Sequence, residues 1–234
     1  MAASPRLSRR VLASLPAEIE RPGYDIESVE TGQVHLGVGA FMRAHAAVYT
    51  DAAIAAKGGP WGVAGVSLRQ PTVRDQLRAQ DCLYTVATHD NETTSRRLIA
   101  AIQSIDVAPD DPQRVIQLLA DASVRVVTMT VTEKGYCLAP DSGMLDTENA
   151  DIAHDINVSN APRSMPGFLV AAMRARRKNN AGPLTVVACD NLPDNGARLQ
   201  RGVLAFSDSV EPSLRAWIDA NVRFPATMVD RIVP

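Results

Sequence analysis

The chain has 234 residues, 46% of them hydrophobic, which is enough to bury the core of one large domain or two small ones. Its formal net charge of −2 gives no reason to expect nucleic acid or an anionic membrane as a partner. No apolar run approaches the roughly 20 residues of a membrane-spanning helix, and no secretory signal follows the basic start.

The N-terminal segment differs in character from the rest of the chain. Residues 1–30 contain three prolines and no sustained hydrophobic periodicity, so we expect them to form an arm. Residues 31–234 are expected to form one folded domain. The three cysteines, at positions 82, 137 and 189, are odd in number and far apart. They indicate thiols in a reducing cytoplasm rather than disulfides or a zinc site.

The domain begins with a strand, a glycine turn and a helix. An apolar run ends near Val38, and an alanine-rich amphipathic pattern follows. This arrangement presents a helix N-terminus and free backbone N–H groups to a phosphate. Gly37 would permit the tight turn, and Gly39 would let a pyrophosphate approach the backbone. Met42 stands where the common fingerprint has a third glycine, so an ordinary glycine turn is the alternative.

The next strand, predicted at residues 61–68, ends without a carboxylate. An acidic residue at this place in a nucleotide-binding βαβ unit selects the unphosphorylated cofactor. Here the sequence continues with leucine, then Arg69 and Gln70. Arg69 either faces a 2′-phosphate or is a solvated loop arginine, so the choice between NAD and NADP stays open.

Strand and helix patterns then alternate along the chain. Thr72 is the predicted N-cap of its helix, residues 89–95 a hairpin loop, and residues 138–160 an irregular excursion. Strands are predicted at residues 83–88, 97–107, 124–131 and 184–188, and helices at residues 72–80, 111–119, 167–178, 197–206 and 212–221. The alternation predicts an α/β fold, a doubly wound and mostly parallel Rossmann-like sheet with helices on both faces.

Four segments in order resemble the mannitol dehydrogenase family, which comprises long-chain polyol dehydrogenases and fructuronate reductases. They are residues 37–45, 130–136, 189–196 and 224–232. The resemblance covers nearly the whole chain and implies that residues 31–234 form a dinucleotide-binding domain. It implies NAD as cofactor, with NADP possible. The implied cofactor contacts are Gly37, Gly39, Phe41, Met42 and Arg43, to which the strand-end position adds Arg69.

Polar residues follow two of the predicted strands and are candidates for the chemistry. Glu133 could simply pair with a neighbouring cation, but the resemblance places it beside the nicotinamide as a proton relay or substrate-orienting group. Lys134 could serve as a base if burial lowered its pKa. The family instead uses a lysine in a Lys-x-x-x-x-Asn-x-x-His motif, which these 234 residues do not contain.

Two further candidates lie toward the C-terminus. Asn191 could close a turn, whereas the resemblance makes it a donor to the oxygen that develops alkoxide charge. Asp194, Asn195 and Gly196 are predicted turn formers, with Gly196 able to tolerate positive φ. Asp230, with its neighbour Val229, is implied as a substrate contact, although an ion pair with the next arginine is the simpler alternative. The four histidines show no zinc-type spacing, so no metal is expected.

By resemblance, the function is NAD(P)-dependent interconversion of a sugar alcohol or aldonate, such as mannitol or mannonate, with its keto form. The first alternative is a nucleotide-binding fragment that lacks the general-base domain and is inactive alone. A Rossmann-like enzyme of unrelated chemistry, such as a methyltransferase, is a second. The expected partner is a small sugar alcohol or hexuronate, with self-association through an uncovered apolar surface.

Overall fold

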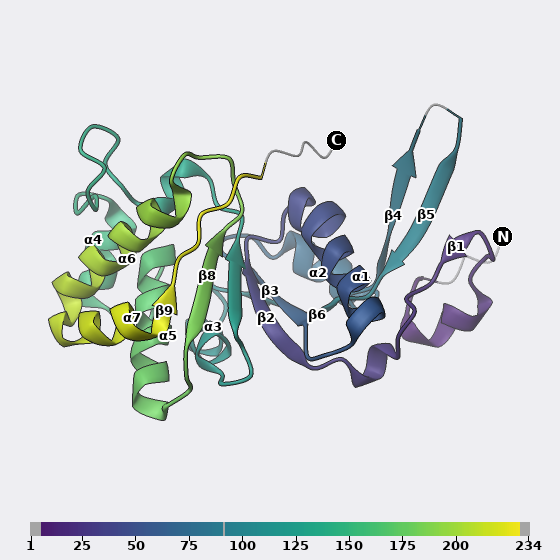
Figure 1. The fold of residues 1–234 in the computed structure, drawn as a ribbon, viewed down its shortest axis with the longest axis horizontal. Coiled ribbons are helices and arrows are strands. Elements are labelled where there is room, and N and C mark those ends of the chain that lie inside the picture. Colours follow the sequence, from purple (N-terminus) through teal and green to yellow (C-terminus); the bar gives the residue numbers. More distant parts are fainter. Residues whose placement is uncertain (1–5, 91, 230–234) are drawn as a thin grey trace.

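The computed structural model describes residues 6–90 and 92–229 (Figure 1). Its centre is a sheet of six parallel strands in the order β6-β3-β2-β7-β8-β9. The strands are β2 (Thr31–Leu36), β3 (Gly62–Ser67), β6 (Ile102–Val107), β7 (Val126–Met129), β8 (Leu184–Ala188) and β9 (Val222–Arg223).

The strand order fixes where a ligand can bind. The chain runs outward from β2 through β3 to β6, then returns to place β7 on the other edge of β2. In open α/β sheets the reversal point opens a crevice at the carboxyl ends of the strands. The predicted doubly wound, Rossmann-like fold is therefore confirmed, and its crevice lies where β2 and β7 end.

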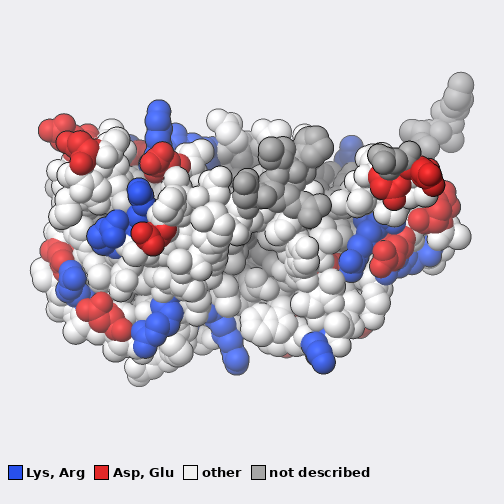
Figure 2. All heavy atoms as spheres, turned by 45° about the horizontal axis from the view of Figure 1, so that its top comes forward, with Lys and Arg blue, Asp and Glu red and all other residues white. Residues whose placement is uncertain are grey.

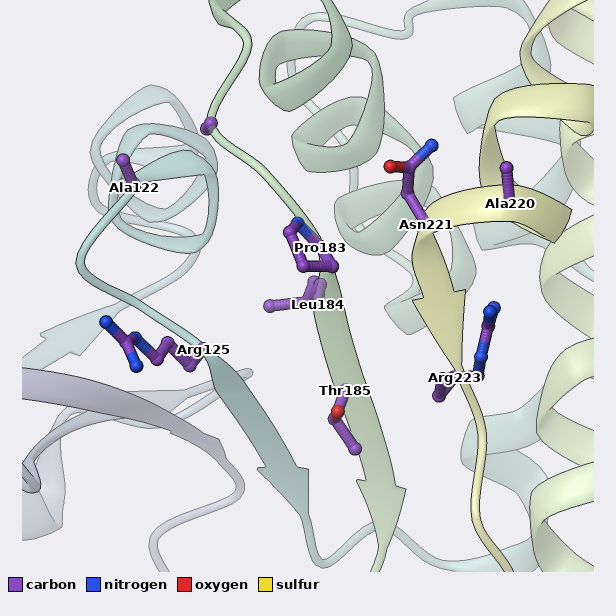
Figure 3. A pocket seen from close by; sticks show the side chains of 9 residues that line it. Ala122, Arg125, Pro183, Leu184, Thr185, Ala220, Asn221 and Arg223 are labelled. Carbon is purple, nitrogen blue, oxygen red and sulfur yellow. The ribbon is translucent and has the colours of Figure 1, made fainter.

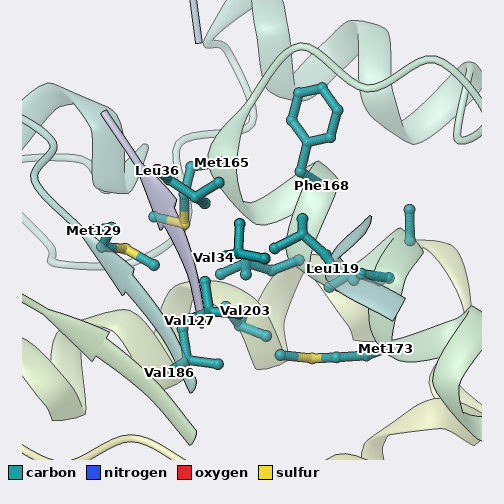
Figure 4. Packing of buried hydrophobic residues seen from close by; sticks show 14 of the residues in the cluster. Val34, Leu36, Leu119, Val127, Met129, Met165, Phe168, Met173, Val186 and Val203 are labelled. Atoms are coloured by element: carbon teal, nitrogen blue, oxygen red, sulfur yellow. The ribbon is translucent and has the colours of Figure 1, made fainter. Parts of the chain in front are cut away.

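Helices cover both faces of this sheet, and two clusters of buried side chains form the core. The larger cluster joins alternate residues of β2, β7 and β8 to α3, α5 and α6 (Figure 4). The smaller one joins β3 and β6 to α1 and α2. The helices are α1 (Ala47–Lys57), α2 (Thr72–Arg78), α3 (Pro112–Ala120), α4 (Ala150–Asn157), α5 (Met165–Asn179), α6 (Asn195–Val210) and α7 (Arg215–Asn221).

Strand alternation explains how β2 serves both faces. Val34 and Leu36 are fully buried toward α3 and α5, whereas His35 between them points to the opposite face. Phe168 and Met173 of α5 pack over the strands in Figure 4. Because both faces are covered, no residue of β2 is exposed, which suits a central parallel strand.

A second, three-stranded sheet lies beside the main one, in the order β1-β5-β4. Its strands are β1 (Ile19–Glu20), β4 (Tyr84–His89) and β5 (Thr94–Ile99). β4 and β5 form the predicted antiparallel hairpin, which projects from the body in Figure 1. Apolar residues of the N-terminal segment pack against Leu83 and Leu98. The division of the chain at residue 30 stays a prediction.

Three local expectations were wrong. The strand predicted at residues 97–107 is two strands in different sheets, because the Ala100 N–H donates to the buried Asp51 carboxylate (3.0 Å) and ends β5. The excursion at residues 138–160 contains α4, capped by Asn149. Pro71, not Thr72, occupies the N-cap position of α2, and no side chain caps that helix.

Charged side chains of both signs lie on the surface, and the three cysteines are free thiols. Figure 2 shows charges of both signs interspersed over the two ends of the face that it presents. None of the helices within residues 6–90 and 92–229 is long and apolar enough to cross a membrane. The cysteines are unpaired, and burial raises the pKa of Cys137 to about 11, so its thiol stays protonated at neutral pH.

Candidate active site

The glycine turn directly follows β2 and has two different halves. Gly37 has φ +95°, and a Cβ there would lie 2.4 Å from the Thr130 carbonyl oxygen. Gly37 N–H donates to Val66 O (2.9 Å), which binds the turn to β3. A Cβ on Gly39, in contrast, would meet no atom within 4 Å. Gly37 is therefore required by the fold, whereas Gly39 faces open space.

That open space is a crevice of about 520 Å³ at the carboxyl ends of β2, β3 and β7. Gly37 and Gly39 line it from below, and the loop after β7 contributes Thr132 and Lys134. The far wall comes from the segment around α4 and the start of α5, namely Asn149, Asp151, Arg163, Ser164 and Met165. This is the position at which open α/β sheets bind ligands.

A second hollow of about 610 Å³ adjoins the first, because the two share Leu68, Arg69, Gln70, Asp151 and Arg163. It extends toward the carboxyl end of β6, where Ala108, Pro109 and Pro112 line it. Together the two hollows form one elongated crevice along the edge of the sheet, which is the shape that an extended dinucleotide requires.

A buried histidine supports the glycine turn from behind. His35 is fully buried on β2, with Nδ1 2.7 Å from Thr128 Oγ1 and Nε2 3.2 Å from the Gly37 carbonyl. Thr130 Oγ1 also donates to Gly37 O (2.7 Å). Burial lowers the pKa of His35 to about 4. The imidazole is thus neutral at physiological pH and holds the turn by hydrogen bonds.

This buried histidine predicts a pH dependence of stability. Between pH 6.5 and 4 the unfolded chain binds a proton that folded His35 refuses, so unfolding becomes easier as the pH falls. Over that range the loss is about 3 kcal/mol, since one pKa unit corresponds to about 1.4 kcal/mol. Urea unfolding of the wild type and of His35→Gln at several pH values would measure it. Equal pH slopes for the two proteins would contradict the assignment.

The helix after the turn positions three of the predicted cofactor contacts. It starts with a π-helical turn, Met42–Ala46, before α1. Met42 is buried in the core with the α1 cluster, and the Phe41 ring stacks on His45 at 4.8 Å. Arg43 Nη1 donates to Val38 O (3.2 Å), at the base of the turn. The cofactor roles of these side chains stay predictions.

Arg69 lies at the rim of the crevice, where the sequence predicts the ribose contact. Its side chain is 83% exposed and lies 3.8 Å from Asp151, whose side chain is 38% exposed. Asp151 belongs to α4, within the segment expected to be irregular, so sequence reasoning missed it. The only sequence signal would have been Asn149 as a helix N-cap.

The candidate residues after β7 and β8 lie at the same edge of the sheet. Glu133 and Lys134 begin a 3₁₀ turn, Glu133–Tyr136, and both are exposed. Asn191 is exposed and lies three residues after Ala188, the last residue of β8. Because β7 and β8 are paired in parallel, the two loops are neighbours. Asp230 lies outside the described residues.

A network of partly buried hydrogen bonds joins these loops to one another. Asp190 accepts from the Tyr136 hydroxyl and from Asn195 Nδ2 (2.9 Å), and its backbone carbonyl accepts from Val229 N–H (3.0 Å). Asn195 Oδ1 in turn accepts from Thr227 N–H (3.0 Å). The loop after β7, the loop after β8 and the C-terminal segment are thereby joined at Asp190, next to Asn191.

Two expectations in this region need correction. Asn195 is not a turn former but a fully buried residue of α6 within the network. Gly196 does not have positive φ; the left-handed residue is Asp194, at φ 55°. A Cβ on Gly196 would lie 2.5 Å from Phe224 O. The absence of a side chain at Gly196 therefore allows the C-terminal segment to pack closely against the start of α6.

A buried carboxylate anchors the far wall of the crevice. Asp155 is fully buried and accepts hydrogen bonds from Ser164 Oγ (2.7 Å), Ser164 N (2.8 Å) and Arg163 N (2.9 Å), with His154 Nδ1 at 2.8 Å. Ser164 Oγ accepts from Gly167 N–H (3.0 Å) and caps α5. The carboxylate therefore ties α4 to the start of α5.

A third hollow, of about 460 Å³, lies at the amino ends of β7, β8 and β9 (Figure 3). Arg125 and Arg223 lie on opposite sides of β8 in this view and do not converge on one point. The hollow is also at the edge of the sheet opposite the glycine turn. We therefore assign the candidate site to the crevice at the carboxyl ends. Within residues 6–90 and 92–229, no histidine, cysteine and carboxylate cluster could hold a metal ion.

Solved structures resemble the chain over nearly its full length. Mannitol 2-dehydrogenase of Pseudomonas fluorescens, solved as a ternary complex with NAD and D-mannitol, has a TM-score of 0.94 and 38% identity. The match covers 98% of this chain and 48% of that one. A D-sorbitol dehydrogenase in substrate-free form has a TM-score of 0.92 and 36% identity, over 97% of this chain and 48% of that one.

Curated relatives agree with the structures. A polyol:NADP oxidoreductase of Gluconobacter oxydans is 37% identical over 97% of this chain and 48% of that protein. A D-mannonate oxidoreductase of Escherichia coli is 39% identical, over 92% and 45%. The chain thus spans about half the length of the curated relatives it matches. The family model described as "Mannitol dehydrogenase Rossmann domain" matches residues 31–234, so the chain belongs to the mannitol dehydrogenase family.

Proposed function

We propose that this chain is the NAD(P)-binding part of a dehydrogenase that interconverts a sugar alcohol or aldonate, such as mannitol or mannonate, with its keto form. The observation that carries the proposal is the glycine turn at the strand-order reversal, with open space over Gly39. A pyrophosphate fits there because a helix begins just after the turn, beside the open space over Gly39, and helix N-termini attract phosphate. The relatives named for NAD and for NADP support both cofactors as candidates.

The nicotinamide, when bound, would exchange a hydride with the substrate carbon. The chain itself supplies orientation and charge stabilisation. Asn191 would donate its amide hydrogen to the substrate oxygen that becomes negatively charged, and Glu133, on the neighbouring loop, would orient the substrate hydroxyl. Asp230 and Val229 would contact the rest of the polyol. The Asp190 network supports these roles because it joins the loops that carry them.

The isolated 234 residues are proposed to bind the cofactor with negligible turnover. General-base catalysis is worth about 10²–10⁴-fold, and the family's lysine motif is not among these residues. This keeps the alternative of a nucleotide-binding unit that is inactive alone. Because the chain spans about half the length of its relatives, self-association through an uncovered apolar surface is a further proposal. The unpaired cysteines support a cytoplasmic location.

Calorimetric titration with NAD and with NADP tests the proposal, followed by steady-state assays with mannitol and mannonate. Binding of at least one dinucleotide in the micromolar to millimolar range is expected. Failure of both to bind would overturn the proposed function. Turnover above about 1 s⁻¹ would place a general base within this chain and would make Lys134 the first residue to replace.

A further inference from the structure

The adenosine end of the crevice lacks the usual acidic residue. After β3, where doubly wound folds carry an aspartate or glutamate for the ribose hydroxyls, this chain has Leu68, Arg69 and Gln70. All three line the shared part of the crevice. If β3 alone formed the ribose site, it would present a cation and an amide and would favour a 2′-phosphate.

A carboxylate reaches the same place from another element. Asp151, in the first turn of α4, lines both hollows of the crevice, and its Oδ2 lies 3.8 Å from Arg69 Nη2. It lies across the crevice from the end of β3, within the wall contributed by the segment before α5. The carboxylate that β3 lacks is thus supplied by α4.

Asp151 is held in place more firmly than its partner. Its N–H donates to the N-cap Asn149 Oδ1 (3.0 Å), and one turn later Asp155 anchors the same helix through buried hydrogen bonds. Arg69, in contrast, is 83% exposed and bound only by this long ion pair among the described residues. The helix backbone that carries the short Asp151 side chain is therefore fixed at the rim, whereas the long Arg69 side chain can turn away from it.

We propose that Asp151 sets the cofactor preference of the crevice. This rests on the proposed function, because it requires a dinucleotide in the two hollows. Asp151 accepts hydrogen bonds from the ribose hydroxyls of NAD and repels the 2′-phosphate of NADP, which Arg69 and the exposed Arg163 attract. The balance of these charges, rather than a residue of β3, decides between the two cofactors.

The test is the ratio of the dissociation constants for NAD and NADP, measured by calorimetry on Asp151→Asn. Removing the fixed charge should shift the ratio about five- to tenfold toward NADP, and the shift should shrink as salt is raised. Arg69→Ala should move the ratio the other way. Titration with 2′,5′-ADP and with 5′-AMP repeats the comparison at the adenosine end alone.

Glu148→Gln is the matched control, because Glu148 is an exposed acid just before α4 that lines neither hollow. An unchanged ratio for Asp151→Asn, or an equal shift in the control, would overturn the inference while leaving the proposed function intact. If the wild type binds neither dinucleotide, the proposed function fails and this inference with it. If Asp151→Asn does not fold, the same ratio is measured on Asp151→Ser, because serine is well tolerated in the first turn of a helix.

Discussion

Replacing Gly39 with valine is expected to weaken dinucleotide binding by about 100-fold or more, because its side chain would fill the space of the pyrophosphate. Stability should change by about 0.5 kcal/mol or less, since a Cβ at this position meets no atom within 4 Å. Calorimetry with NAD and NADP measures the first effect, and urea unfolding measures the second.

Gly37→Ala is the matched contrast at the other glycine of the turn. Here φ is +95° and the added Cβ would lie 2.4 Å from a backbone oxygen, so a loss of about 2–4 kcal/mol in unfolding free energy is expected. A Gly39→Val protein that folds normally and binds both dinucleotides as tightly as the wild type would remove the turn from the cofactor site.

Asp155→Ala should be the most destabilising single change in the crevice wall. The substitution leaves the Ser164 N–H and hydroxyl and the Arg163 N–H without their acceptor in a buried site. Losing these hydrogen bonds should lower the free energy of unfolding by about 3–5 kcal/mol, because the buried donors are left unpaired. The carboxylate also fills the space beside Gly167, where a Cβ would lie 2.2 Å from Asp155 Oδ2, so its removal leaves a gap in the packing of α5.

Urea unfolding of Asp155→Ala measures this loss, with Asp151→Asn on the same helix as the control. The control should lose about 1 kcal/mol or less, because Asp151 is partly exposed and its ion pair is long. Equal losses in the two variants would show that Asp155 does not anchor the wall. NAD affinity should fall in Asp155→Ala as well, since that wall lines the crevice.

Hydrophobic periodicity predicted the main sheet well because its strands are short and buried on both faces. The strand at residues 184–188 was predicted with the bounds of β8. Periodicity could not assign strands to sheets, so β5 and β6 were read as one strand. The break at Ala100 depends on a hydrogen bond to Asp51, which is 49 positions away in the sequence. A local sequence pattern cannot predict a contact with so distant a residue.

The site was predictable where backbone conformation or strand order determines it. Gly37 and Gly39 line the crevice, and the loops of Glu133 and Asn191 are neighbours because β7 and β8 pair. Asp151 and Asp155 were not predictable, since their importance arises from the packing of α4 against distant segments. Asn195 was misread because a buried amide in a network and an exposed turn asparagine have the same local sequence.

The strand order also governs how the chain can be assembled during synthesis. β2 can pair with β3 as soon as residue 67 has left the ribosome, but its other edge waits for β7, which ends at Met129. For the time needed to make about 60 residues, at roughly 5–20 residues per second, the nascent chain carries the open edge of a central strand of the sheet. Unpaired strand edges invite aggregation. The interval between β3 and β7 is therefore the stage at which a newly made chain most needs a chaperone.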